Sequence, residues 1–234
     1  IIHQIDTTKF AISNEETRFY LNGIYLHVND NGMLASVATD GHRLALTQMD
    51  MPENVDHIPE VILPKKAISE LRKLIDDHEG EIQINLSETR AEFSFGGVKL
   101  TTKLIDGSFP DYTKVIPVGN DKILLVNTNQ FSSAVDRVST ISSEKSRSVK
   151  MNVKNGLLTL SASNPDASSA SEEIEISYSG EELEIGFNAR YLLEIAQQID
   201  SDIMQIALSD PGSPSLISSP DSKNNLFVLM PMRV

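Results

Sequence analysis

The segment Asp40-Gly41-His42-Arg43 places a carboxylate, an imidazole and a guanidinium in one turn. A histidine beside a carboxylate can act as a general base, so a hydrolase that uses His42 and Asp40 is one interpretation. Such an enzyme also needs an oriented nucleophile, and the sequence has no Gly-x-Ser-x-Gly motif. A turn of this composition is more often structural than catalytic.

Metal and cofactor sites find no support in the sequence. The five histidines have neither His-x-x-x-His nor His-Glu-x-x-His spacing, and the absence of cysteine excludes thiolate ligands and disulfides. The Gly-Gly pair in Phe95–Val98 has the pattern of a hairpin turn rather than of a phosphate-binding loop. We therefore expect no metal, no cofactor and no catalytic residue.

Composition sets the class of protein. A chain of 234 residues with 40% hydrophobic and 23% charged residues can form one large or two modest globular domains. The lack of cysteine suits a reducing compartment, so we expect a cytoplasmic protein. No apolar run approaches the roughly 20 residues that cross a bilayer. A net charge of −13 argues against tight electrostatic wrapping of nucleic acid.

The chain contains an internal repeat. A shift of 124 positions lays Asn31–Thr39 over Asn155–Ser163, and the same shift lays Lys66–Leu71 over Arg190–Ile195. The identities are few, but their order is maintained along the chain. The repeat predicts two copies of one domain.

The two copies are predicted to cover residues 1–117 and 118–234, and each has two amphipathic helices among alternating strands. Strands in runs indicate an α+β fold, with two helices packed on antiparallel β-sheet in each copy. The second copy opens with a strand at Lys122–Val126, whereas the first copy starts almost at once with a helix. We therefore expect that the first domain lacks its first strand and that the sequence begins inside a domain.

Three local predictions are specific enough to test. The helix after Lys122–Val126 is expected to be capped by Thr128 or Asn129. A strand is expected over Glu173–Ser179. In the second helix of the first copy, Lys66–Asp76, the inward side chains are expected to be Ile68, Leu71, Leu74 and Ile75.

Positive charge is concentrated on the predicted helices, while the predicted strands are rich in glutamate. A domain polarised in this way can face phosphates with one side although its total charge is negative. Solvated helix faces and a protein-interaction module independent of DNA are the alternatives. The cations that should decide between them are Lys66, Arg72, Lys73, Arg137 and Arg190.

The repeat also bears on the Asp40–Arg43 turn. The second copy has Asn164-Pro165-Asp166 where the first has Asp40-Gly41-His42, so His42 and Arg43 are special to the first copy. An exposed arginine beside Leu44 would be a typical anchor of a protein interface.

Three motifs occur in order: Ala-Thr-Asp-Gly-His-Arg-Leu-Ala at Ala38–Ala45, Phe-Pro-Asp-Tyr at Phe109–Tyr112, and Met-Pro-Met-Arg at Met230–Arg233. Together with the tandem repeat, they make the chain resemble the bacterial sliding-clamp family, the beta subunit of DNA polymerase III. The resemblance covers essentially all of the chain and corresponds to the middle and C-terminal domains of a three-domain protomer, without its N-terminal domain.

The resemblance implies a non-catalytic DNA sliding clamp, the processivity factor of a polymerase holoenzyme. Family protomers form a head-to-tail homodimer ring around duplex DNA, whose lining helices face phosphates without reading sequence. It implies a dimer face at Thr140 and Ile141. Without the N-terminal domain, we expect this 234-residue chain to be monomeric.

The resemblance further implies a groove that binds short linear motifs of DNA polymerases, the clamp loader and repair factors. The residues carried over to one pocket are Leu21, Thr39, Gly41, His42, Arg43, Leu44, Pro110, Val115, Val228 and Met230. Those carried over to an adjoining shallower site are Arg18, Tyr20, Asn188, Tyr191, Pro231, Met232 and Arg233.

Overall fold

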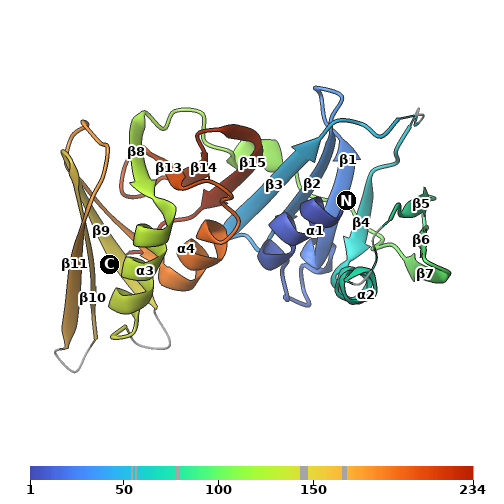
Figure 1. The fold of residues 1–234 in the computed structure, drawn as a ribbon, viewed down its shortest axis with the longest axis horizontal. Coiled ribbons are helices and arrows are strands. Elements are labelled where there is room, and N and C mark those ends of the chain that lie inside the picture. Colours follow the sequence, from blue (N-terminus) through green and yellow to red (C-terminus); the bar gives the residue numbers. More distant parts are fainter. Residues whose placement is uncertain are drawn as a thin grey trace. The chain divides into compact units, whose positions relative to one another are not determined.

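The computed structural model describes residues 1–53, 55, 57–76, 78, 80–142, 147–164 and 168–233. The chain divides into two compact units, Ile1–Tyr112 and Thr113–Val234 (Figure 1). The division falls at Tyr112, a few residues before the predicted join, because Tyr112 is buried and its hydroxyl lies 3.0 Å from Nε2 of His27 in the first unit.

The first unit has one four-stranded antiparallel sheet, in the order β4-β1-β2-β3, and a separate three-stranded sheet, β5-β6-β7. Helix α1 packs on β2 and β3, and α2 packs on β4 and β1 (Figure 1). Short 3-10 turns η1 and η2 follow α1. The elements are α1 (Ile2–Thr8), η1 (Lys9–Ala11), η2 (Phe19–Leu21), β1 (Gly23–Val28), β2 (Leu34–Thr39), β3 (Arg43–Met49), β4 (Val61–Pro64), α2 (Lys65–Ile75), β5 (Gln83–Leu86), β6 (Arg90–Phe95) and β7 (Val98–Lys103).

The second unit has strands in the orders β11-β10-β9-β12 and β15-β14-β13-β8. Helices α3 and α4 pack against each other, α3 on β10 and β11, and α4 on β12 and β15 (Figure 1). The elements are η3 (Tyr112–Val115), β8 (Lys122–Asn127), α3 (Thr128–Ser139), β9 (Ser148–Lys154), β10 (Leu157–Ser163), β11 (Ser169–Glu175), β12 (Leu183–Asn188), α4 (Ala189–Ala196), β13 (Ile203–Leu208), β14 (Ser215–Ser219) and β15 (Ser222–Leu229).

The predicted repeat is a repeat of structure. The order β4-β1-β2-β3 has its counterpart in β12-β9-β10-β11, and β5-β6-β7 has its counterpart in β13-β14-β15. The aligned segments fall on β2 and β10, and on α2 and α4. Each unit therefore carries two helices on antiparallel sheet, which confirms the predicted α+β class. Strand β8 pairs with β13, and none of the described residues of the first unit forms its equivalent beside β5.

Helix α3 shows which part of a helix the sequence determines. The apolar side chains that recur at helical spacing, among them Phe131 and Val135, are fully buried. The predicted caps were wrong, because the side chain of Asn127 accepts the backbone N–H of Gln130 at 3.0 Å. Thr128 instead donates its hydroxyl to a backbone carbonyl at residue 201, at 2.8 Å.

Two other local predictions were wrong. Leu74 is 44% exposed, whereas Ile68, Leu71 and Ile75 are buried. At 3.6 residues per turn, Leu74 projects about 90° away from the centre of the stripe that these three side chains form. Strand β11 covers Ser169–Glu175, so the expected strand at Glu173–Ser179 overlaps only its end.

The turn between β6 and β7 is confirmed as a two-residue hairpin turn. Gly96 and Gly97 have φ values of 52° and 80°, in the left-handed region that glycine adopts without steric cost. Two central residues with positive φ match the right-handed twist of the paired strands.

Candidate functional site

The Asp40–Arg43 turn is held by its own carboxylate. Oδ1 of Asp40 accepts the backbone N–H groups of His42 at 2.9 Å and Arg43 at 3.1 Å, and Oδ2 accepts Nε of Arg43 at 3.2 Å. Thr39 closes the turn by donating its hydroxyl to the carbonyl of Arg43 at 2.7 Å. The Asp40 carboxylate is thus engaged with the turn rather than with the His42 imidazole, so the hydrolase interpretation gains no support.

Arg43 was expected to be exposed, and that expectation was wrong. Its side chain is 6% exposed. Nη2 donates to the carbonyl of Phe10 at 2.6 Å, and Cζ lies 4.9 Å from the centre of the Phe10 ring. The reason is that α1 and η1 pack beside β3 and bring Phe10 over the turn. Arg43 is an internal anchor of the first unit, and His42 is the exposed side chain of the turn.

A second arginine is fixed beside the same turn. Nη2 of Arg18 donates to the carbonyl of Asp40 at 3.1 Å, and Nε and Nη2 bind the Glu15 carboxylate at 2.8 and 2.6 Å. The hydrogen bond from Arg18 lowers the pKa of Glu15. Gly41 has φ of 87°, and a Cβ there would lie 2.6 Å from Nη1 of Arg18. Because Gly41 has no Cβ, the guanidinium of Arg18 can approach the backbone of the turn closely.

The other predicted groove residues of the first unit lie on adjoining elements. Thr39 and Leu44 are opposite each other on β2 and β3. Turn η2 carries Tyr20, which is half-buried, and Leu21, which is buried. We call this set the first wall: Arg18, Tyr20, Leu21, Thr39, Gly41, His42, Arg43, Leu44 and Pro110.

Phe19 was not predicted from the sequence; it precedes Tyr20 and is 51% exposed. Its ring meets that of Tyr20 edge to face, with 5.8 Å between ring centres. An exposed aromatic ring that packs against a half-buried one is typical of recognition surfaces. The only signal for it in the sequence is the pair of adjacent aromatics.

A column of rings fixes the segment that carries Pro110. The Phe109 ring stacks on Tyr25, with 4.8 Å between centres and 6° between planes. Tyr25 stacks in turn on His27 at 4.5 Å, and Nε2 of His27 lies 3.0 Å from the hydroxyl of Tyr112. Pro110 therefore lies between two aromatic residues that are both attached to β1.

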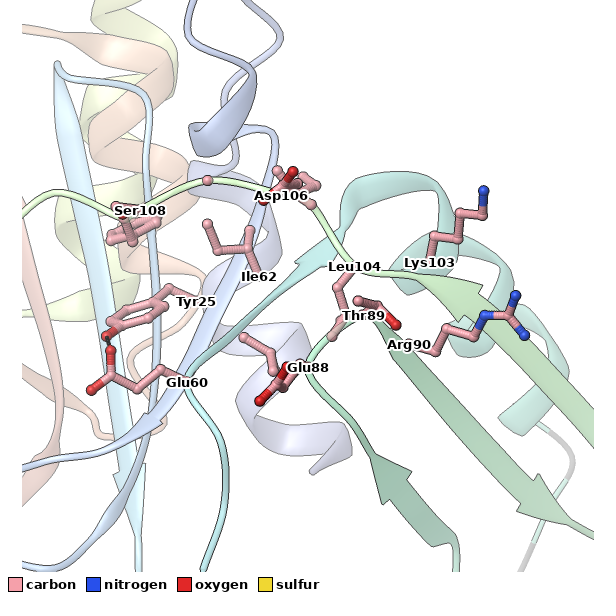
Figure 2. Close-up of a pocket in the computed structure, with 14 residues that line it drawn as sticks. Tyr25, Glu60, Ile62, Glu88, Thr89, Arg90, Lys103, Leu104, Asp106 and Ser108 are labelled. Atoms are coloured by element: carbon pink, nitrogen blue, oxygen red, sulfur yellow. Dashed lines mark hydrogen bonds between the residues drawn. The ribbon is translucent and has the colours of Figure 1, made fainter.

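Two of these rings, Tyr25 and Phe109, border a cavity of about 500 Å³ in the first unit. Figure 2 shows Tyr25 and Glu60 at one end of it, Arg90 and Lys103 at the other, and Leu104 between them. The Tyr25 hydroxyl donates to Glu60 at 2.7 Å, and burial together with this hydrogen bond raises the pKa of Tyr25. None of the predicted site residues lines this cavity.

Three of the predicted groove residues of the second unit, Asn188, Tyr191 and Met232, lie where β12 meets α4. The side chain of Asn188 caps α4 by accepting the N–H groups of Arg190 at 3.0 Å and Tyr191 at 3.4 Å. The N–H of Met232 donates to the carbonyl of Gly186 at 2.8 Å, which attaches the end of the chain to β12.

The predicted groove side chains of the second unit differ in solvent exposure. Val228 is buried in β15, whereas Met230 is 41% exposed and Val115, in η3, is 51% exposed. We call this set the second wall: Val115, Asn188, Tyr191, Val228, Met230, Pro231, Met232 and Arg233.

The predicted DNA-facing cations lie on the helices, as the sequence indicated. Lys66, Arg72 and Lys73 are on α2, Arg137 is on α3, and Arg190 is on α4. Most of them also have a carboxylate partner in their own unit. The ion pairs are Arg72 with Asp6 and Asp76, Lys73 with Glu70, Arg137 with Glu172, and Arg190 with Glu194.

The predicted dimer face lies at the end of α3. Thr140 is exposed and Ile141 is half-buried. Nearby, Nε of Arg137 binds Glu172 of β11 at 3.0 Å, which turns this guanidinium toward the edge of the sheet. This ion pair raises the pKa of Arg137 and lowers that of Glu172.

Two further searches cover the described part of the chain. No group of three or more His, Asp or Glu side chains there is arranged to hold a metal ion. No helix there is long and apolar enough to span a membrane.

Known proteins match the whole chain. The family described as DNA polymerase III beta subunit, central domain, matches residues 1–111, and the one described as its C-terminal domain matches residues 113–233. The beta sliding clamp of Caulobacter vibrioides is 50% identical over 237 residues, which cover 100% of this chain and 64% of that protein. That of Pseudomonas aeruginosa is 41% identical, over 98% of this chain and 62% of that protein.

Solved structures agree. A sliding clamp of Bartonella birtlesii bound to griselimycin has a TM-score of 0.96 and 52% identity, over 100% of this chain and 63% of that chain. The Caulobacter crescentus clamp solved with polyethylene glycol has a TM-score of 0.97 and 50% identity, over 100% and 63%. The chain thus spans less than two thirds of the length of these relatives.

Proposed function

The chain belongs to the DNA polymerase III beta subunit family, and from that premise we propose that it forms the middle and C-terminal domains of a DNA sliding clamp. In this role it acts in the cytoplasm as a non-catalytic processivity factor. It encircles duplex DNA as part of a homodimeric ring, with Thr140 and Ile141 on the dimer face, and it tethers polymerases, the clamp loader and repair factors.

The observation that carries this proposal is the construction of the two walls. In the first wall, Arg43 and Asp40 make the turn rigid from inside, and His42 is left exposed on it. In the second wall, the Met232 backbone is attached to β12 and Met230 is exposed. A peptide site needs exposed side chains on a fixed backbone, because such a site loses little conformational freedom when the peptide binds.

The chemistry of the walls suits short linear motifs. The exposed side chains of Val115 and Met230 can accept apolar anchors, and burial of a partner's Leu or Phe contributes roughly 1.5–3 kcal/mol. Methionine adapts to anchors of different shape, which suits a surface that serves several partners in turn.

Duplex DNA is proposed to lie along the helices. Cations on α2, α3 and α4 can contact phosphates without reading bases, so binding is independent of sequence. A net charge of −13 is compatible with this role because a closed ring retains DNA by topology and does not need high affinity.

A peptide titration tests the groove. We expect saturable binding of a Gln-Leu-x-Leu-Phe peptide to the wild-type chain, measured by calorimetry. The double variant His42→Ala/Met230→Ala should bind at least tenfold more weakly, since interface side chains of this kind contribute about 1 kcal/mol or more each. Met49→Ala is the matched control, because Met49 is 37% exposed but lies outside both walls. Equal affinity of the double variant and the control would refute the groove.

A further inference from the structure

The ion pairs on the helices of the first unit are centred on Asp6. Nε of Arg72 binds both carboxylate oxygens of Asp6, at 3.0 and 2.9 Å, and Nη1 binds Asp76 at 3.0 Å. Lys9, one turn from Asp6 along the chain, binds the same carboxylate. One acidic residue on α1 therefore engages two cations and connects α1 to α2.

The second unit also pairs a candidate DNA-facing cation with a carboxylate, in this case within one helix. Nε of Arg190 binds Oε1 of Glu194 at 3.0 Å, one turn along α4. In α2 of the first unit, Lys73 binds Glu70 at 3.1 Å. Cations on both candidate DNA-facing surfaces thus have nearby carboxylates that compete with phosphate for the same N–H donors.

The pairs are weak enough to exchange. The side chains of Arg72 and Asp6 are 30% and 33% exposed, and ion pairs at such positions contribute about 0–1 kcal/mol. A phosphate can replace a carboxylate on a guanidinium because both accept the same pair of N–H groups. A DNA phosphate that binds Arg72 must therefore displace the Asp6 carboxylate, and the net free energy gained from that contact is small.

Resting on the proposed DNA-facing role of these helices, we propose that Asp6 sets the DNA affinity of the first unit. It holds Arg72 and Lys9 in ion pairs, so that the charge of these two cations is already neutralised by a carboxylate when the duplex approaches. The duplex is then held loosely, each contact exchanges quickly, and translation along the duplex costs little. Asp6 is a positioning residue in this account, since it acts on DNA through Arg72.

The test is a titration of the ¹⁵N-labelled chain with a 12-base-pair duplex, followed by NMR at several salt concentrations. In Asp6→Asn we expect affinity to rise about fivefold to tenfold near 0.1 M salt. The slope of log K against log salt should steepen by about 0.9, as for one added phosphate contact. Glu88→Gln removes one negative charge from an exposed position in the same unit and should change neither quantity appreciably.

The variant Arg72→Gln separates two explanations for a gain in affinity in Asp6→Asn. One is that Arg72 is released to bind phosphate, and the other is that Asp6 no longer repels the phosphates. If Asp6 acts by holding Arg72, the gain from Asp6→Asn should fall to about twofold in the Arg72→Gln background. An equal gain in both backgrounds, or no gain in Asp6→Asn while α2 amides still shift on DNA addition, would overturn this inference and leave the clamp function standing. No shift on α2 or α4 in any variant would instead overturn the DNA-facing role itself.

Discussion

Replacement of Arg43 should destabilise the first unit far more than replacement of its exposed neighbour His42. Arg43→Ala removes an ion pair at 3.2 Å to Asp40, a charged hydrogen bond at 2.6 Å to the Phe10 carbonyl, and a guanidinium 4.9 Å from the Phe10 ring. Loss of one partner from a buried pair costs about 3–5 kcal/mol. Asp40 is 17% exposed and keeps two backbone N–H donors, so we expect about 2–3 kcal/mol.

Because the chain has two units, the free energy of unfolding should be measured for the first unit alone, by urea denaturation with amide hydrogen exchange of β2 and β3. His42→Ala is the matched control in the same turn, and we expect a change within about 0.5 kcal/mol. Arg43→Lys keeps the charge but loses the planar fork, so its loss should be intermediate. If Arg43→Ala costs no more than His42→Ala, the internal-anchor role of Arg43 is wrong.

Three further perturbations test other parts of the molecule. Gly41→Ala should lower the free energy of unfolding by about 1–2 kcal/mol, because Gly41 has a positive φ and a Cβ there would contact Arg18. Gly97 also has a positive φ but lies in open space, so Gly97→Ala should lower the free energy of unfolding only by the cost of the backbone conformation. Urea denaturation curves of the two variants compare these effects. Asn127→Ala should cost about 1 kcal/mol and increase hydrogen exchange in the first turn of α3. Because its pKa is raised in the folded state, Tyr25 ionises first in the unfolded state, so stability should fall above about pH 10, and Tyr25→Phe should flatten this fall in Tm measured from pH 9 to 11; an unchanged slope would contradict the assignment.

Periodicity predicted the fold where apolar side chains recur regularly. The buried face of α3 follows from the spacing of Phe131, Val135 and Val138, and the repeat predicted equivalent strand orders. The prediction of the cap of α3 failed because Asn127, Thr128 and Asn129 are three successive residues that all cap helices well, and only the path of the backbone decides among them. Strand β11 was misplaced because it begins with alternating serine and alanine, which give no contrast in hydrophobicity.

Family motifs led to a set of residues for the proposed groove, but the interactions that hold these residues could not be predicted from the sequence. Family motifs identified Gly41, His42 and Arg43 together. One partner of Arg43 is the backbone carbonyl of Phe10, which lies 33 residues away in sequence, and no local pattern indicates such a contact. In the same way, the charge pattern identified Arg72 but could not show that Asp6 already occupies its guanidinium.

If the proposed groove is a target for inhibitors, the division of the Asp40–Arg43 turn into an inner arginine and an outer histidine bears on resistance to them. An inhibitor that depended on the His42 imidazole could be evaded by a single substitution there, because that side chain is exposed and we expect its replacement to change stability little. An inhibitor that instead matched the backbone shape of the turn would face a target whose escape variants must disturb Arg43 or Gly41. Such variants would be depleted from cells by unfolding and proteolysis before they could confer an advantage.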